Sequence, residues 1–370
     1  MSIYEKLGIK TGINAWGTVT KLGGSRLSSE VLQAMADAGK SFVPMFEFHR
    51  RAGEYIAGLL GAEACCVTCG AAAGLAVSAA ACMTRGEHPK ALRLPDTTGM
   101  PDEILMLKAH RILYDQALRL SGAAIREVGT TSFAAPDLLE AELNHRTALF
   151  AYVAEAECMR GSVPLPGLVP VLKRHGIPIV VDAAAELPPV ENINKYLGMG
   201  ADLVVFSGGK EIRGPQASGF IVGGKEWIDA CHANCCPGYG IGRSMKISKE
   251  TVAGLVAAVE CFVRKDYHLQ MAVWEDMTKR ICASFAGRGD ARIRAGYPNE
   301  PGVQPATILR AYVKPLGMPA EALRDKLLGA PTPIFVDLHH DEIVLNPQCL
   351  EPEELEPLIE TLHRCLDDAR

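Results

Sequence analysis

Short apolar runs alternate with helical segments through much of the chain, and this alternation constrains the fold more than any other feature. We expect strands at residues 64–68, 124–128, 149–154, 177–181, 202–206 and 219–223, and helices from about residue 71 and at 167–175. Most of these runs are apolar throughout, as in strands that are buried on both faces. The pattern predicts an α/β domain with a mostly parallel sheet that helices cover on both faces.

The pattern changes after about residue 249. We expect two long helices, then short strands and a helix, and finally an amphipathic helix, at residues 251–263, 269–286, 307–313, 319–328, 334–338, 343–346 and 351–366. This order is typical of an α+β lobe. A chain of 370 residues commonly forms two lobes. We therefore predict a large domain at residues 45–248, a small domain at 249–370, and an N-terminal segment at 1–44 that contacts the active site.

The composition excludes several classes of protein. The 43 acidic and 38 basic residues give a net charge of −5, which argues against a basic nucleic-acid-binding surface. Hydrophobic residues make up 48%, too many for a disordered chain. No run of about 18 apolar residues could span a membrane, and the first residues are polar, unlike a signal peptide. We expect a cytoplasmic protein whose twelve cysteines are reduced thiols.

Two residues that follow apolar strands suggest a chemistry. Asp182 ends the run Ile-Val-Val-Asp, and Lys210 follows the run at residues 202–206 and two glycines. The two residues are one strand–helix–strand step apart, so neighbouring parallel strands would place both at the same sheet edge. An acid and a lysine there suit pyridoxal phosphate: the lysine forms a Schiff base, and the acid keeps the pyridinium nitrogen protonated.

A third segment could bind the phosphate of such a cofactor. Residues 65–73, Cys-Cys-Val-Thr-Cys-Gly-Ala-Ala-Ala, are expected to form a strand end, a tight turn and a helix start. Free N–H groups at a helix N-terminus bind phosphate through hydrogen bonds and the helix dipole. The small side chains would leave the approach open. The three segments occur in the chain order of a fold type I pyridoxal-phosphate enzyme.

The segment at residues 206–219, Phe-Ser-Gly-Gly-Lys-Glu-Ile-Arg-Gly-Pro-Gln-Ala-Ser-Gly, resembles the lysine motif of the bacterial selenocysteine synthase family. It is more similar to the shorter D-glucosaminate-6-phosphate ammonia-lyase-like proteins of that group. Supporting motifs are Ile-Asn-Ala-Trp-Gly at 13–17, Leu-Leu-Gly-Ala-Glu at 59–63 and Gly-Ile-Gly-Arg at 240–243. The resemblance covers most of residues 10–260. It implies a fold type I transferase with a seven-stranded, mostly parallel sheet, a smaller C-terminal α+β domain, and pyridoxal 5'-phosphate as cofactor.

The resemblance also implies roles for individual residues. Lys210 would form the Schiff base and carry the proton at the substrate Cα, and Asp182 would pair with the pyridine nitrogen. Selenocysteine synthases carry asparagines in the phosphate loop, whereas here the phosphate would depend on backbone N–H groups and one hydroxyl. The remaining cofactor contacts would be the backbone of Cys69, Gly70 and Ala71, the hydroxyl of Ser207, and Ala184 and His110 on the two faces of the ring.

Substrate binding needs a fixed cation for the substrate carboxylate, usually an arginine. The candidates are Arg26, Arg213 and Arg243, and the sequence does not choose among them. A substrate phosphate would need a second cation, such as Lys246 or Arg51. In this superfamily the neighbouring subunit often completes the site, which implies at least a homodimer.

Two further clusters contain potential metal ligands. The segment at residues 231–236, Cys-His-Ala-Asn-Cys-Cys, has no second Cys-x-x-Cys pair, which structural zinc sites favour. His339, His340 and Asp341 fall in an expected hairpin turn, where polar residues are usual. We therefore expect no metal site.

The leading functional hypothesis is a pyridoxal-phosphate lyase that removes ammonia from a small β-hydroxy amino acid or amino sugar acid and yields a 2-keto acid. Racemase, aldolase and aminotransferase activities share the same carbanion chemistry and remain alternatives. Selenium transfer on seryl-tRNA is a further alternative. The short segment before Asn14 and the negative charge argue against it, so we expect a small-molecule substrate and neither a nucleic-acid nor a membrane partner.

Overall fold

The computed structural model describes residues 2–295 and 305–367. The chain divides into two compact units, Leu27–Lys265 and the combination of Met1–Arg26 with Asp266–Arg370. These bounds differ from the expected divisions after residues 44 and 248. The reason is packing: α11 (Lys249–Arg264) lies against both α2 (Ser29–Gly39) and α3 (Met45–Leu60), so all three helices belong to the larger unit.

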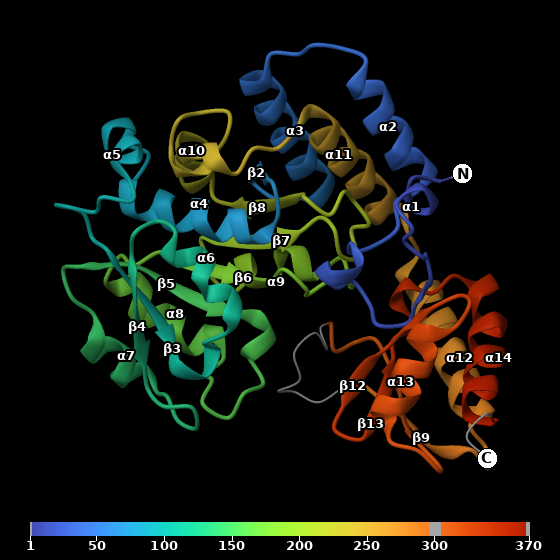
Figure 1. Cartoon of the computed structure of the whole chain (residues 1–370). Helices are drawn as coiled ribbons and strands as arrows, with labels where there is room; N and C mark the ends of the chain where they lie inside the picture. Colours follow the sequence, from blue (N-terminus) through green and yellow to red (C-terminus); the bar gives the residue numbers. More distant parts are fainter. Residues whose placement is uncertain (1, 296–304, 368–370) are drawn as a thin grey trace. The chain divides into compact units, whose positions relative to one another are not determined.

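The unit Leu27–Lys265 is built on a seven-stranded sheet (Figure 1). Strand β8 runs opposite to the other six strands of this sheet, so the mostly parallel sheet is confirmed. In spatial order the strands are β2 (Ala64–Thr68), β8 (Gly219–Gly223), β7 (Leu203–Ser207), β6 (Ile179–Asp182), β5 (Thr147–Val153), β3 (Glu103–Leu107) and β4 (Ala124–Val128).

Helix α4 (Ala71–Thr84) is the central helix of this unit. Residues 73–84 are all buried, because the helix packs on the strands from β5 to β2 and against neighbouring helices (Figure 1). Its small side chains allow this close contact on every side. The other helices are α5 (His88–Arg93), α6 (Gln116–Arg119), α7 (Pro136–Glu142), α8 (Leu165–Arg174), α9 (Asn192–Gly198) and α10 (Lys225–Asn234).

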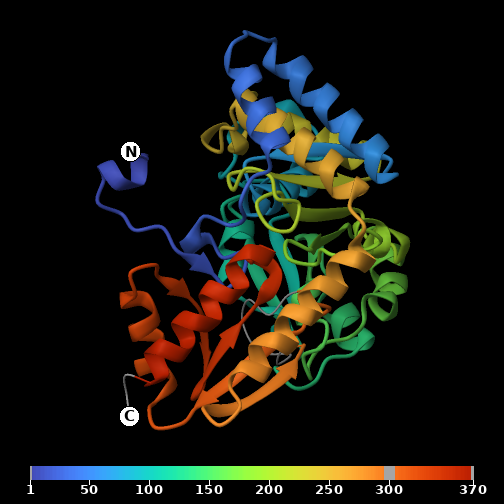
Figure 2. The same ribbon diagram turned by 90° about the vertical axis from the view of Figure 1, so that its right-hand side faces the viewer.

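The second unit is α+β, as expected (Figure 2). Its antiparallel sheet has the order β12 (Asp337–His339), β13 (Glu342–Leu345), β10 (Arg310–Pro315) and β9 (Gly289–Arg294). Helices α12 (Tyr267–Ser284), α13 (Ala320–Gly329) and α14 (Leu355–Asp367) share one core with this sheet. The N-terminal residues join the same unit: α1 (Ile3–Lys6) leads to β1 (Ile13–Asn14), which pairs in parallel with β11 (Ile334–Phe335).

In the described part of the chain, none of the helices has the length and apolar character needed to cross a bilayer.

Candidate active site

Asp182 and Lys210 lie on neighbouring elements of the large sheet. Asp182 is the last residue of β6 and is in register with Val205 on β7, which runs parallel to β6. Lys210 follows Ser207, the last residue of β7, by three positions. The carboxyl ends of the two strands meet at one sheet edge, the place where α/β proteins bind ligands. The adjacency expected from the spacing is therefore present.

Burial and opposite charge act in different directions on this pair. Burial raises the pKa of the Asp182 carboxyl, while the charge of Lys210 and the N–H of Ala184 lower it; that N–H donates to Asp182 Oδ1 over 3.1 Å. Burial lowers the pKa of Lys210, and the charge of Asp182 opposes this effect. A lysine with a lowered pKa is more often the free amine, which is the nucleophilic form that attacks an aldehyde.

Two further carboxyl groups, which the sequence analysis missed, lie near Lys210. Glu155 is in the short 3-10 helix η4 (Ala154–Ala156) directly after β5, and Glu186 lies four residues past the end of β6. Burial raises the pKa of both, that of Glu186 to about 7, and both carboxyls interact electrostatically with Lys210. Each glutamate follows a buried parallel strand, and that position is the signal that could have identified them.

Residues 69–71, which we call the phosphate loop, form the start of α4. Gly70 is the N-cap residue with a φ of 128°, a backbone conformation that favours glycine. Among the described residues no side chain caps this helix end, which leaves its first N–H groups available to an anion. Thr68 Oγ1 donates to the carbonyl oxygen of Gly70 over 3.0 Å and so supports the turn. The loop can therefore bind a phosphate through its backbone.

Ser207 lies in the same row of the sheet as the end of β2. Gly219 of β8 is in register with Ser207 on one side and with Thr68 on the other. A Cβ atom on Gly219 would come within 2.7 Å of the carbonyl carbon of Gly70 and 2.9 Å of the nitrogen of Ala71. The absence of a side chain at Gly219 thus leaves the phosphate loop its space.

His110 is fully buried beside the end of β5. The N–H of Val153 donates to Nδ1 over 3.1 Å, so Nε2 carries the proton and donates to Ser162 Oγ over 2.8 Å. Burial lowers its pKa to about 4, which keeps the imidazole neutral. The ring stands edge-on to Tyr152, with centroids 4.5 Å apart. The ring has no exposed face. Its stacking on the cofactor and the role of Ala184 both stay predictions.

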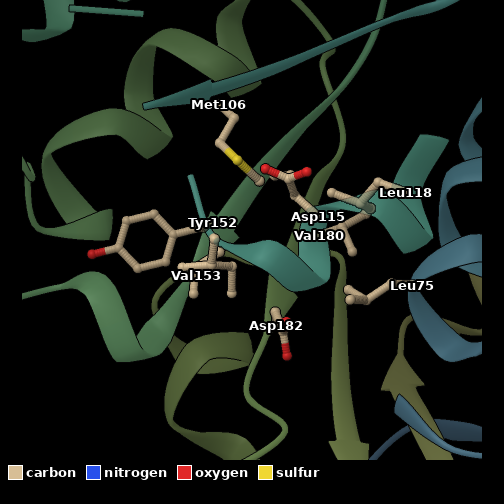
Figure 3. Close-up of a pocket in the computed structure, with 10 residues that line it drawn as sticks. Leu75, Met106, Asp115, Leu118, Tyr152, Val153, Val180 and Asp182 are labelled. Carbon is tan, nitrogen blue, oxygen red and sulfur yellow. The ribbon is translucent and has the colours of Figure 1, made fainter. Parts of the chain in front are cut away.

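A small apolar cavity lies behind Asp182 (Figure 3). Leu75 of α4 and Val180 of β6 line it, and Asp115 lies at its far side. The Asp182 carboxylate points away from the other labelled side chains. Lys210 is not among the lining residues, so this cavity is the apolar support behind the carboxylate rather than the ligand site.

The three arginine candidates are in different surroundings. Arg213 has a φ of 55°, which is uncommon for a residue with a side chain, and its N–H donates to the carbonyl oxygen of Lys210 over 2.9 Å. Arg243 is exposed on the 3-10 helix η5 (Ile241–Ser244). Arg26 belongs to the smaller unit, where it forms an ion pair with Glu354. Within the larger unit Arg213 lies next to Lys210, and the three substrate roles stay predictions.

In residues 2–295 and 305–367, no group of three or more His, Cys, Asp and Glu side chains is arranged to hold a metal ion.

The site fits pyridoxal phosphate in three respects. Asp182 can face a pyridinium nitrogen, and Lys210 supplies an amine at the same sheet edge. The phosphate loop offers uncapped N–H groups and the space that a Cβ on Gly219 would fill.

Comparison with known proteins identifies the family. The family model described as SelA, L-seryl-tRNA selenium transferase, matches residues 13–280. The chain belongs to the SelA family.

Three curated relatives of this SelA-family chain align over nearly its whole length. D-glucosaminate-6-phosphate ammonia lyase of Salmonella typhimurium is 33% identical over 100% of this chain and 99% of the relative. The 5'-C-glycyluridine monooxygenase-decarboxylase of a Streptomyces species is 31% identical over 99% of this chain and 92% of the relative. The L-seryl-tRNA(Sec) selenium transferase of Nitratidesulfovibrio vulgaris is 26% identical over 96% and 81%.

Solved structures give the same result for the fold. The structure of a D-glucosaminate-6-phosphate ammonia-lyase matches with a TM-score of 0.85 and 32% identity, covering 100% of this chain and 99% of that one. Serine palmitoyltransferase of Sphingomonas wittichii matches with a TM-score of 0.61 at 16% identity, covering 97% and 88%. The expected fold type I architecture of pyridoxal-phosphate enzymes is confirmed, and the chain is an enzyme of this cofactor class.

Proposed function

We propose that this chain is a pyridoxal-phosphate-dependent ammonia-lyase that converts a small β-hydroxy amino acid or amino sugar acid into a 2-keto acid and ammonia. The observation that carries the proposal is the similarity to D-glucosaminate-6-phosphate ammonia lyase, because it extends over the full length of both chains. The alignment therefore covers the smaller unit as well as the segment that contains Lys210. The supporting geometry is the Asp182–Lys210 pair beside an uncapped helix N-terminus.

In this proposal four elements hold the cofactor. Lys210 would bond to the cofactor's aldehyde carbon, Asp182 would pair with its pyridine nitrogen, and the phosphate loop with Ser207 would bind its phosphate. Bound pyridoxal phosphate supplies an electron sink for the electron pair that remains when the substrate loses its Cα proton. The roles of Ala184 and His110 beside the ring belong to the same proposal.

The residues of the chain then transfer the protons of the reaction. The lowered pKa of Lys210 leaves more of its amine unprotonated, and the free amine can take the proton from the substrate Cα. The β-hydroxyl leaves as water when a proton reaches its oxygen. Glu155 and Glu186 are the carboxyls near Lys210 that can hold such a proton, because burial raises the pKa of both. This elimination leaves the substrate as an enamine, and water then adds to the imine tautomer and breaks the C–N bond, which releases ammonia and the 2-keto acid.

The test is a product assay on a substrate panel. Purified protein loaded with pyridoxal phosphate is incubated with β-hydroxy amino acids and amino sugar acids, including D-glucosaminate 6-phosphate, and both ammonia and 2-keto acid are measured. We expect equal amounts of the two products. Lys210→Ala should lose the visible absorption band of the Schiff base and the activity, whereas the matched control Lys225→Ala, at an exposed position on α10, should keep both.

Other products would contradict the proposal. A 2-keto acid without ammonia would indicate transamination, and Cα–H exchange in heavy water without net product would indicate racemisation. Oxygen consumption with loss of carbon dioxide would match the name of the Streptomyces relative instead. A salt-dependent shift of tRNA in a gel would support selenium transfer.

We also propose that the protein is a cytoplasmic homodimer or larger oligomer. Large apolar side chains that are exposed in the single chain support this proposal, notably Phe42, Phe46 and Leu113, the last of which is 96% exposed. Sedimentation of the loaded protein tests it: a monomer at micromolar concentration would contradict it.

A further inference from the structure

The thiols of Cys66 and Cys235 lie together beside the phosphate loop. Cys66 is on β2 and fully buried, and Cys235 directly follows α10 and is 4% exposed. Their Sγ atoms lie 3.8 and 3.7 Å from the same carbonyl oxygen, that of Val67. The two thiols also interact with each other electrostatically. Strand β2 and the end of α10 therefore bring together two cysteines that are far apart in the sequence.

The surroundings favour ionisation of one member of the pair. The interaction with the Cys66 thiol lowers the pKa of Cys235, whereas the interaction with Cys235 and burial raise the pKa of Cys66. Cys235 is thus the sulfur that becomes the thiolate, the reactive form. His232 Nδ1 lies 3.7 Å from Cys66 Sγ. Burial lowers the pKa of His232, so its imidazole is neutral and can accept the proton of Cys66.

We propose that Cys66 and Cys235 form a redox-active dithiol, which hydrogen peroxide closes to a disulfide, and that closure weakens cofactor binding at the phosphate loop. The Cys235 thiolate attacks one peroxide oxygen, the O–O bond breaks, and hydroxide leaves and is protonated to water. The Cys66 sulfur then displaces the second oxygen from the Cys235 sulfenic acid. That oxygen leaves as water with the proton accepted by His232. Two thiols lose two electrons, and one peroxide becomes two waters.

The link to the cofactor follows from the elements involved. Strand β2 ends at Thr68, directly before the phosphate loop, and α10 packs against both β2 and α4, the two elements that flank the loop (Figure 1). A disulfide bond is about 2 Å long, much shorter than a hydrogen-bonded thiol contact. Closing it therefore shifts β2 or the end of α10. This second half of the inference rests on the proposed role of residues 69–71.

The experiment uses the protein loaded with pyridoxal phosphate and fully reduced. Hydrogen peroxide is added stepwise, linked peptides are identified by mass spectrometry, and retained cofactor is measured by absorbance after gel filtration. We expect a Cys66–Cys235 peptide that dithiothreitol removes, and several-fold faster loss of cofactor from the oxidised protein. Cofactor retention by the reduced protein is measured first, so a protein that never binds the cofactor refutes the proposed function rather than the dithiol.

Matched variants separate the dithiol from general oxidation. Cys66→Ser and Cys235→Ser should abolish both effects. Cys65→Ser, the adjacent buried position on β2, and Cys231→Ser, one turn earlier on α10, should keep both. The linked peptide is sought in the unsubstituted protein, so a variant that fails to fold does not decide the outcome. The inference is overturned if exposed Cys158 is oxidised while no Cys66–Cys235 peptide forms, or if the peptide forms and cofactor loss is unchanged.

Discussion

Replacing Glu186 by glutamine tests the electrostatics of the candidate site. Glu186 Oε1 is buried and has no hydrogen-bond partner among the described residues. Burial raises the pKa of this carboxyl from 4.5 to about 7. Nearby Glu155, Glu157 and Asp182 act in the same direction, and Lys195 opposes them. The folded protein therefore binds a proton at Glu186 more tightly than the unfolded chain does.

The sign and size of the effect follow from this difference. The stabilisation from the bound proton is fully present below pH 4.5 and is lost as the pH rises through about 7. At about 1.4 kcal/mol per pKa unit, the loss amounts to about 3 kcal/mol. Glutamine has the shape of the protonated acid and does not ionise. We therefore expect Glu186→Gln to match the wild type near pH 4.5 and to be more stable by up to about 3 kcal/mol near pH 8.

The assay is urea unfolding of both proteins, followed by circular dichroism at several pH values between these limits. Glu226→Gln, an exposed position on α10, serves as the matched control and should show no pH-dependent difference from the wild type. If the stability difference between Glu186→Gln and the wild type is the same at both ends of the pH range, burial does not raise the pKa of the Glu186 carboxyl.

Three glycines give further predictions. Gly53→Ala on α3 places a Cβ 2.2 Å from the rigid carbonyl oxygen of Cys65, so the melting temperature should fall by the equivalent of about 1–3 kcal/mol. Gly58→Ala on the same helix meets open space and should stabilise the protein by about 0.5–1 kcal/mol; a loss would contradict the contact argument. Gly219→Ala places a Cβ 2.7 Å from Gly70 and should weaken pyridoxal phosphate binding in an absorbance titration, whereas unchanged affinity would argue against the phosphate loop.

Several elements of the larger unit could be predicted from local sequence. The strands expected at residues 64–68, 124–128 and 219–223 have the bounds of β2, β4 and β8. Strand β3 was not predicted, because Glu-Ile-Leu-Met-Leu contains good helix formers and a short apolar run does not by itself distinguish a strand from a buried helix. The direction of a strand could not be predicted either. Strand β8 is antiparallel, and an apolar run between glycines has the same sequence pattern in either direction.

The division into units depended on packing between distant segments. Residues 13–14 form a strand with residues 334–335, and α11 packs on α2 and α3. Neither contact has a local signal, because an amphipathic helix or a two-residue strand shows only that it has a partner and not which one. The expected divisions after residues 44 and 248 therefore followed changes in sequence pattern rather than packing.

The sequence by itself determined the α/β class and the pairing of Asp182 with Lys210, because a residue at the end of a buried strand is placed by its own strand and by one crossover. Only the tertiary structure decided what surrounds that pair. Strand register and helix packing bring Glu155 and Glu186 near Lys210. They also set Ser207 opposite Gly219 and place Cys66 beside Cys235. The physical reason is that the pKa and the contacts of a side chain depend on residues that folding brings near it from distant segments. A sequence pattern shows only the secondary structure that each segment favours.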